Sequence, residues 1–144
     1  MVESPRLPGL TLADADRLVR AALEFAEKQG FSPLAVAVID LTGELIVLRR
    51  GDAGIPVSSR MAVAKARSAL RDLKPSRELD ALPPGIIDGF QHLYGGDFVP
   101  RAGGVLVTVD NVILGALGAS GASSDQDEEA VIAAVERWQA ERTS

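Results

Sequence analysis

The chain has 144 residues, no cysteine and 47% hydrophobic residues, which together are typical of one globular domain of ordinary size. Disulfide and thiolate chemistry are excluded because cysteine is absent. With 15 Lys and Arg against 20 Asp and Glu, the formal net charge is −5, so nucleic acid is not an expected partner. The first ten residues lack the basic and apolar regions of a signal peptide, and no apolar stretch reaches the ~20 residues that span a bilayer. We therefore expect a cytoplasmic protein without a membrane partner.

The first predicted element is an amphipathic helix that begins after Thr11. Apolar residues recur at spacings of three and four over residues 12–26, and Gly30 follows as a C-terminal stop. The Thr11 hydroxyl suits the N-cap of this helix. Before the helix, residues 1–9 are expected to form an extended N-terminal segment of a single domain that spans residues 1–144.

A β-hairpin is predicted next. Residues 34–39 (LAVAVI) contain no polar side chain, and the apolar pattern resumes over residues 44–49 after an Asp-Leu-Thr-Gly turn. The first of these strands is apolar on both faces, which is typical of a strand that is covered on both sides. Helices are therefore expected on at least part of each face of the sheet.

Small residues dominate the second predicted helix, which ends at about Asp72. Ser58 or Ser59 is its expected cap, because a serine hydroxyl can accept a hydrogen bond from the first turn of a helix. The small side chains permit a close approach to a neighbouring element. After this helix, residues 76–82 are predicted to form a short turn of helix.

Residues 86–94 are ambiguous: they fit another short helix, although Gly89 weakens that interpretation. Residues 97–102 lie between two Gly-Gly pairs and are expected to cross the surface. Residues 105–109 and 112–119, joined by a tight Asp-Asn turn, predict a second hairpin.

The last predicted helix begins with a capping box, S-x-x-Q, over residues 123–126. Acidic residues over 125–129 complement the positive end of its helix dipole. Its buried stripe is expected to consist of Ala130, Val131, Ala134, Val135 and Trp138. The order of elements is α-ββ-α(α)-ββ-α, which predicts an α+β domain whose antiparallel sheet is built from two hairpins and flanked by helices.

Three side chains are candidates for acid–base catalysis: His92, Lys65 and Tyr94. His92 is the sole histidine of the chain, and histidine is the side chain that changes charge near neutral pH. Lys65 lies in a helix of small residues, where a desolvated amine can act as a base or bind an anion. The alternatives are a surface role for His92 and a lysine whose amine reaches water.

Four residues are candidates for substrate binding. Arg50 and Arg101 suit an acidic substrate, and Ser120 and Gly121 lie in a small-residue turn whose N–H groups can face an anion. The alternative for this turn is close packing with positive φ at Gly118 and Gly121, and valine at either position should then cost about 1 to 3 kcal/mol. One histidine with scattered carboxylates lacks the spacing of a metal site, so none is predicted.

Four segments, taken in order, resemble the GlcG/HbpS family of haem-degrading-type domains, which also form the C-terminal part of PduO-like corrinoid enzymes. The resemblance spans residue 10 to about residue 140. It implies an antiparallel sheet with helices packed against it and a tendency to form homo-oligomers. The segments are LTLADADRLVRAALEFA, AVAVIDLTGELIVLRR, SSRMAVAKARSAL and FVPRAGGVLVTVDNVILGALGASGASSDQDEEA.

Members of this family are linked to haem binding and degradation, to redox sensing and to corrinoid metabolism. The resemblance therefore makes haem a candidate ligand, although no cofactor is required by the residues themselves. Haem needs an axial ligand, and without cysteine the candidates are His92, Tyr94, Met61 and Lys65.

Two functions are consistent with these features. The first is a small-molecule pocket protein, such as a cofactor-independent lyase, isomerase or cyclase that acts on a small acidic or carbonyl-containing metabolite; whether it is an enzyme stays open. The alternative is a haem- or corrinoid-binding accessory or sensor protein without turnover. A purely structural oligomer or operon partner is a third. The expected partners are a small-molecule ligand and further copies of the chain.

Overall fold

Four antiparallel strands form one sheet in the order β2-β1-β4-β3. The computed structural model describes residue 2 and residues 9–143, so most of the predicted extended segment over residues 1–9 lies outside the described residues. Both predicted hairpins are confirmed, and they join through the pairing of β1 with β4. The strands are β1 (Ala35–Ile39), β2 (Leu45–Arg50), β3 (Gly104–Val109) and β4 (Val112–Ser120).

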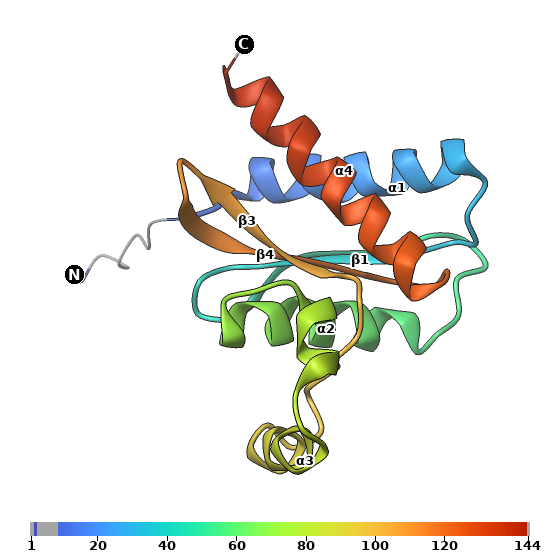
Figure 1. The fold of residues 1–144 in the computed structure, drawn as a ribbon. Coiled ribbons are helices and arrows are strands. Elements are labelled where there is room, and N and C mark those ends of the chain that lie inside the picture. The colour runs from blue at the N-terminus through green and yellow to red at the C-terminus, as the bar shows by residue number, and fades with distance from the viewer. Residues whose placement is uncertain (1, 3–8, 144) are drawn as a thin grey trace.

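Helices cover both faces of this sheet, as Figure 1 shows. Helices α1 (Leu12–Gln29) and α4 (Ser124–Thr143) pack together on one face, and α2 (Ser58–Asp72) lies on the other. All five residues of β1 are buried, which confirms that this strand is covered on both sides. A 3₁₀ helix η1 (Ser76–Ala81) and a helix α3 (Pro84–Leu93) connect α2 to β3. The predicted α+β architecture is therefore confirmed.

Two of the predicted helix starts are confirmed by their hydrogen bonds. The Thr11 hydroxyl accepts from the N–H of Asp14, and the Asp14 carboxylate accepts from the N–H of Thr11. Ser123 and Gln126 make the equivalent reciprocal pair at the start of α4. The predicted serine cap of α2 is wrong: the N-cap is Val57, and the buried Ser58 donates its hydroxyl to the Ile55 carbonyl instead.

The segment predicted to cross the surface is only partly exposed. Phe98 is 3% exposed, and its ring packs against the rings of Phe90 and Tyr94. The N–H of Val99 donates to the hydroxyl of Ser68 on α2 over 2.9 Å. The ring of Phe98 and the N–H of Val99 therefore both contact other parts of the protein, and these contacts fix the middle of the segment against α2 and α3.

Close packing of α2 on the sheet depends on two paired glycines. Gly104 of β3 and Gly118 of β4 face each other in the strand register. A Cβ atom at Gly118 would lie 2.1 Å from the carbonyl oxygen of Ala62, and one at Gly104 would lie 2.1 Å from that of Lys65. The predicted positive φ is confirmed at Gly121, where φ is 133°, but is wrong at Gly118. Contact with the α2 backbone, not φ, is the reason for glycine at Gly118.

Asp14 links α1 to α4 and is expected to make stability depend on pH. Its carboxylate accepts from Thr11 and from the indole N–H of Trp138 over 3.2 Å. Burial raises the pKa of Asp14, but these hydrogen bonds and the nearby Arg142 outweigh burial, so its pKa lies below the ordinary 3.8. A lowered pKa means that the stabilisation is present above pH 3.8 and is lost as pH falls through the folded-state pKa.

Thermal unfolding between about pH 5 and pH 2 checks this expectation. The melting temperature of the Asp14→Asn protein should fall less steeply with acid than that of the wild type. Asp88→Asn is the matched control, because Asp88 is exposed on α3. Equal acid sensitivity of all three proteins would contradict the role given to Asp14.

Candidate functional site

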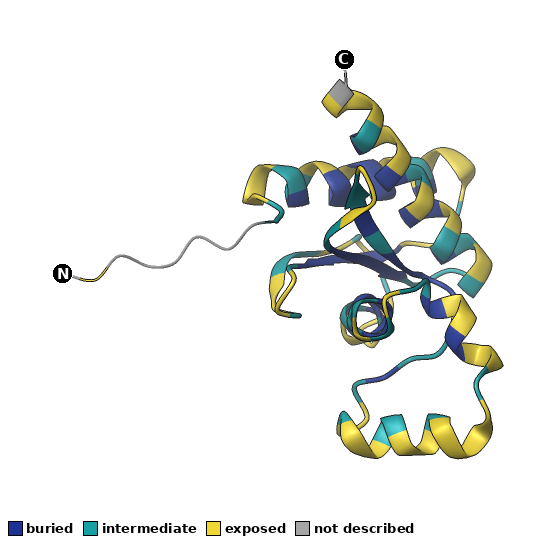
Figure 2. Ribbon diagram, turned by 60° about the vertical axis from the view of Figure 1, so that its left-hand side comes forward, coloured by how far each residue is buried: buried dark blue, intermediate teal, exposed yellow. Residues whose placement is uncertain are grey.

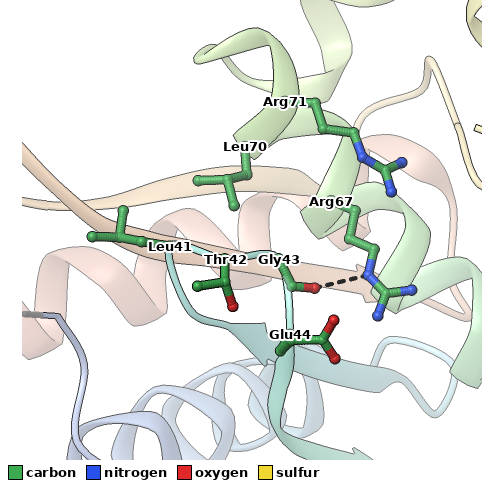
Figure 3. Close-up of a pocket in the computed structure, with 7 residues that line it drawn as sticks. All are labelled: Leu41, Thr42, Gly43, Glu44, Arg67, Leu70 and Arg71. Atoms are coloured by element: carbon green, nitrogen blue, oxygen red, sulfur yellow. Dashed lines mark hydrogen bonds between the residues drawn. The ribbon is translucent and has the colours of Figure 1, made fainter. Parts of the chain in front are cut away.

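Two adjoining pockets lie along α2 and share Arg67. The first, here named the turn pocket, has a volume of about 480 Å³ and is formed by the β1–β2 turn (Leu41, Thr42, Gly43 and Glu44) with Arg67, Leu70 and Arg71. Figure 3 shows Leu41 and Leu70 on one side of it and both guanidinium groups on the other. The second, named the α2 groove, has a volume of about 550 Å³. It is lined by Leu48, Ser59, Arg60, Met61, Val63, Ala64, Arg67, Gly95, Gly96, Asp97 and Val99.

The α2 groove combines an apolar wall with positive charge. Leu48 reaches it from β2, and Met61 and Val63 reach it from α2. Arg60 and Arg67 line the same space, and so does Asp97, whose carboxylate is paired with Arg67. Pockets of this size hold small molecules, and guanidinium groups bind carboxylates or phosphates through paired hydrogen bonds. The groove is therefore suited to a largely apolar ligand that carries acidic groups.

A network of four side chains lies at the junction of the two pockets. Arg67 donates to the carbonyl of Gly43 over 2.9 Å and to the carboxylate of Asp97 over 3.2 Å. Arg71 donates to the same carboxylate over 3.0 Å, and its guanidinium lies 4.0 Å from the centre of the Tyr94 ring. The network ties α2 both to the β1–β2 turn and to the chain that follows α3.

Lys65 forms a buried ion pair, not a group free to react. Its amine lies 3.0 Å from the Asp127 carboxylate, and the two side chains are 3% and 2% exposed. The other oxygen of Asp127 accepts from the N–H of Ala122. Burial raises the pKa of the Asp127 carboxyl, and the Lys65 ammonium and the Ala122 N–H offset part of that rise. The amine is thus neither unpaired nor in contact with water, which differs from both predictions for Lys65.

The three predicted catalytic residues are not joined by hydrogen bonds in the described part of the chain. His92 is exposed on α3, whereas Tyr94 packs against Phe90, Phe98 and Arg71. Lys65 is engaged by Asp127. The exposed position of His92 fits the surface role given as its alternative, and the catalytic role of these residues stays a prediction.

The predicted substrate-binding residues are also dispersed. Arg50 is exposed and lies against the Gly54 backbone, and Ser120 pairs with Ala35 at the end of β4. Gly121 packs against the carbonyl of Pro33. Arg101 lines a separate pocket of about 360 Å³ with Arg77, Asp80, Ala102, Ser124 and Asp125.

Sequence reasoning missed Arg67 and Asp97 as site residues and Asp127 as the partner of Lys65. No local pattern could have found the last pair, because 62 residues separate its members. In the described part of the chain, no group of three or more histidines, cysteines and carboxylates is placed to hold a metal ion. No described helix is long and apolar enough to cross a bilayer.

Comparison with known proteins decides the family. The family model described as "Haem degrading protein HbpS-like" matches residues 10–136. The chain belongs to the HbpS-like family. This finding confirms the resemblance drawn from the four sequence segments.

The HbpS-like relatives include a larger enzyme and two solved structures. The corrinoid adenosyltransferase PduO of Salmonella typhimurium LT2 is 33% identical over 120 residues, which are 82% of this chain but 35% of PduO. The protein ORFY of Klebsiella pneumoniae has a TM-score of 0.85 at 25% identity and covers 97% of both chains. A structure of PduOC in complex with haem has a TM-score of 0.81 at 32% identity, covering 89% of this chain and 94% of PduOC.

Proposed function

We propose that this protein binds a haem-type tetrapyrrole in the α2 groove and acts as an accessory or sensor protein without turnover. The observation that carries the proposal is that one groove of about 550 Å³ joins the Met61 thioether, apolar side chains and the guanidinium groups of Arg60 and Arg67. Apolar walls suit a flat macrocycle, and guanidinium groups suit its carboxylates. The haem complex of PduOC and the description of the family support this choice of ligand.

The side chains present fit a haem through Met61. Of the four candidate axial ligands, Met61 lines the groove, whereas Lys65 is buried against Asp127. Tyr94 is covered on one ring face by Arg71, and His92 is exposed on α3. A thioether is an established axial ligand of haem iron, which supplies redox chemistry when it is bound.

Titration with hemin tests the proposal. The Soret band of the wild type should shift saturably, with one equivalent of hemin per chain. Met61→Leu should change the position of the Soret band, and Arg60→Gln should weaken binding by about tenfold if it loses a charge-assisted contact of 1.4 kcal/mol. Arg17→Gln on α1 removes the same charge from an exposed position outside the groove and is the matched control.

Two outcomes would contradict the proposal. Unsaturable drift of the absorbance in the wild type would exclude specific tetrapyrrole binding. If Met61→Leu matches the wild type while His92→Ala abolishes the Soret shift, the ligand binds elsewhere and the groove is excluded. The hypothesis of a lyase, isomerase or cyclase and the expected self-association of the chain stay predictions, since no contact in the described part of the chain favours either.

A further inference from the structure

Two arginines of α2 converge on one carboxylate oxygen. Arg67 Nη1 and Arg71 Nη2 donate to Oδ2 of Asp97 over 3.2 and 3.0 Å, and Arg71 also donates to the Asp97 backbone carbonyl. A carboxylate from a ligand would be bound by the same donors. We propose that Arg67 and Arg71 form a binding site for a ligand carboxylate, and that Asp97 is an internal competitor which the ligand displaces.

The arginine pair is held in place by contacts that do not involve Asp97. Arg67 donates from Nε to the Gly43 carbonyl, and Arg71 lies over the Tyr94 ring. Each guanidinium has five N–H donors, so these contacts leave donors free for an anion. The two guanidinium groups are therefore expected to keep their arrangement after the Asp97 carboxylate turns away from them.

Asp97 is placed where it can leave at low cost. Its side chain is 32% exposed, and it follows Gly95 and Gly96, which have φ values of 60° and 84° and open space at their Cβ positions. The preceding helix α3 has no buried residue and stands away from the body of the protein (Figure 2). Rotation of one carboxylate into water thus disturbs little packing.

Charge around the pair indicates the direction from which the ligand arrives. Glu44 lines the turn pocket beside Arg67 and Arg71, so on that side a negative charge offsets part of the positive charge of the pair. Arg60 lines the α2 groove, which adds positive charge on the other side of Arg67. Arg67 lines both pockets and Arg71 lines the turn pocket, so with Asp97 displaced a carboxylate that enters from the groove meets Arg67 first and Arg71 behind it.

An internal competitor lowers the apparent affinity by the fraction of molecules in which the site is free. This inference takes its ligand class from the proposed binding in the α2 groove, but its test does not need a tetrapyrrole. The probe is succinate, with dimethyl succinate as the uncharged control. Binding is followed by amide chemical shifts of Gly43 and of residues 95–97.

Asp97→Asn should bind succinate about fivefold or more tightly than the wild type, since the competing charge is removed. Asp88→Asn changes the net charge equally on exposed α3 and should match the wild type. Arg71→Gln should lose the response, and Arg17→Gln should keep it. Equal affinities of the Asp97→Asn and Asp88→Asn proteins, or a loss of affinity in Asp97→Asn, would overturn the proposal.

Hydrogen exchange of the wild type gives a second measurement that does not depend on a variant folding. Saturating succinate should speed amide exchange over residues 95–97, because the Asp97 carboxylate no longer ties this segment to the arginines of α2. Unchanged exchange there would also overturn the inference. If hemin does not bind but succinate gives these responses, the proposal of tetrapyrrole binding is contradicted and the proposal of a carboxylate site is supported.

Discussion

Asp127→Ala is expected to lower the free energy of unfolding by about 3 to 5 kcal/mol, because it leaves the Lys65 ammonium buried without a counter-charge. The Lys65 side chain is 3% exposed and runs against Gly103, where a Cβ atom would lie 2.9 Å from its Nζ. The amine therefore has little room to reach water. The N–H of Ala122 would lose its carboxylate acceptor as well.

A double-mutant cycle measured by urea unfolding separates the interaction energy between Lys65 and Asp127 from the effect of each side chain alone. Lys65→Met should cost a similar amount, whereas Lys65→Met with Asp127→Leu should recover most of the loss, since apolar side chains of similar volume can replace a buried ion pair. The surface comparison is Asp16, which forms ion pairs with both Arg20 and Arg49, and Asp16→Ala should cost less than about 1 kcal/mol. If Lys65→Met and Asp127→Ala each lower the free energy of unfolding by as little as Asp16→Ala does, water screens the charges of the buried pair.

Gly118→Val should destabilise the protein by about 3 kcal/mol or more, because added atoms would overlap the α2 backbone. The nearest atoms are the Ala62 carbonyl oxygen at 2.1 Å and the Ala66 nitrogen at 2.8 Å from an ideal Cβ. Neither belongs to a flexible side chain, so α2 would have to move away from the sheet. Denaturant unfolding measures the loss.

Gly89→Ala is the control for this substitution. Gly89 lies within α3 with open space at its Cβ position, so alanine there should raise stability by up to about 1 kcal/mol through helix propensity alone. A Gly118→Val protein as stable as Gly89→Ala would show that the close contact between α2 and β4 does not exist in solution.

Local patterns in the sequence predicted most of the fold. The Thr11 cap and the Ser123–Gln126 capping box depend on hydrogen bonds between residues three apart, so local spacing predicts them; the reciprocal bond that Asp14 accepts from Thr11 was not predicted. The failure at Ser58 has a physical reason. A serine hydroxyl at the start of a helix can accept a hydrogen bond from an N–H of the first turn, or it can donate one to a carbonyl of the preceding loop. Ser58 does the second, because the carbonyl of Ile55 lies within reach of its hydroxyl.

The candidate site was much harder to predict, because its members come from distant parts of the chain. Arg67 meets Asp97 across 30 residues and Gly43 across 24. The acidic run in the first turns of α4 presents a similar difficulty. It fits the helix dipole, yet Asp127 is the one member that is buried, where it pairs with Lys65 of α2. Such pairings depend on how helices pack on opposite faces of a sheet, which residue spacing does not encode.

The fluorescence of Trp138 reports on the packing of α1 against α4. This residue is the sole tryptophan of the chain, it is 1% exposed, and it lies between α4 and α1, where its indole N–H meets Asp14. The α2 groove is lined by residues of α2, the helix that covers the opposite face of the sheet (Figure 1). Emission from Trp138 therefore follows separation of α1 from α4 during unfolding. Quenching by an absorbing ligand in the groove would act through space across the sheet, and a transparent ligand such as succinate would leave the emission unchanged.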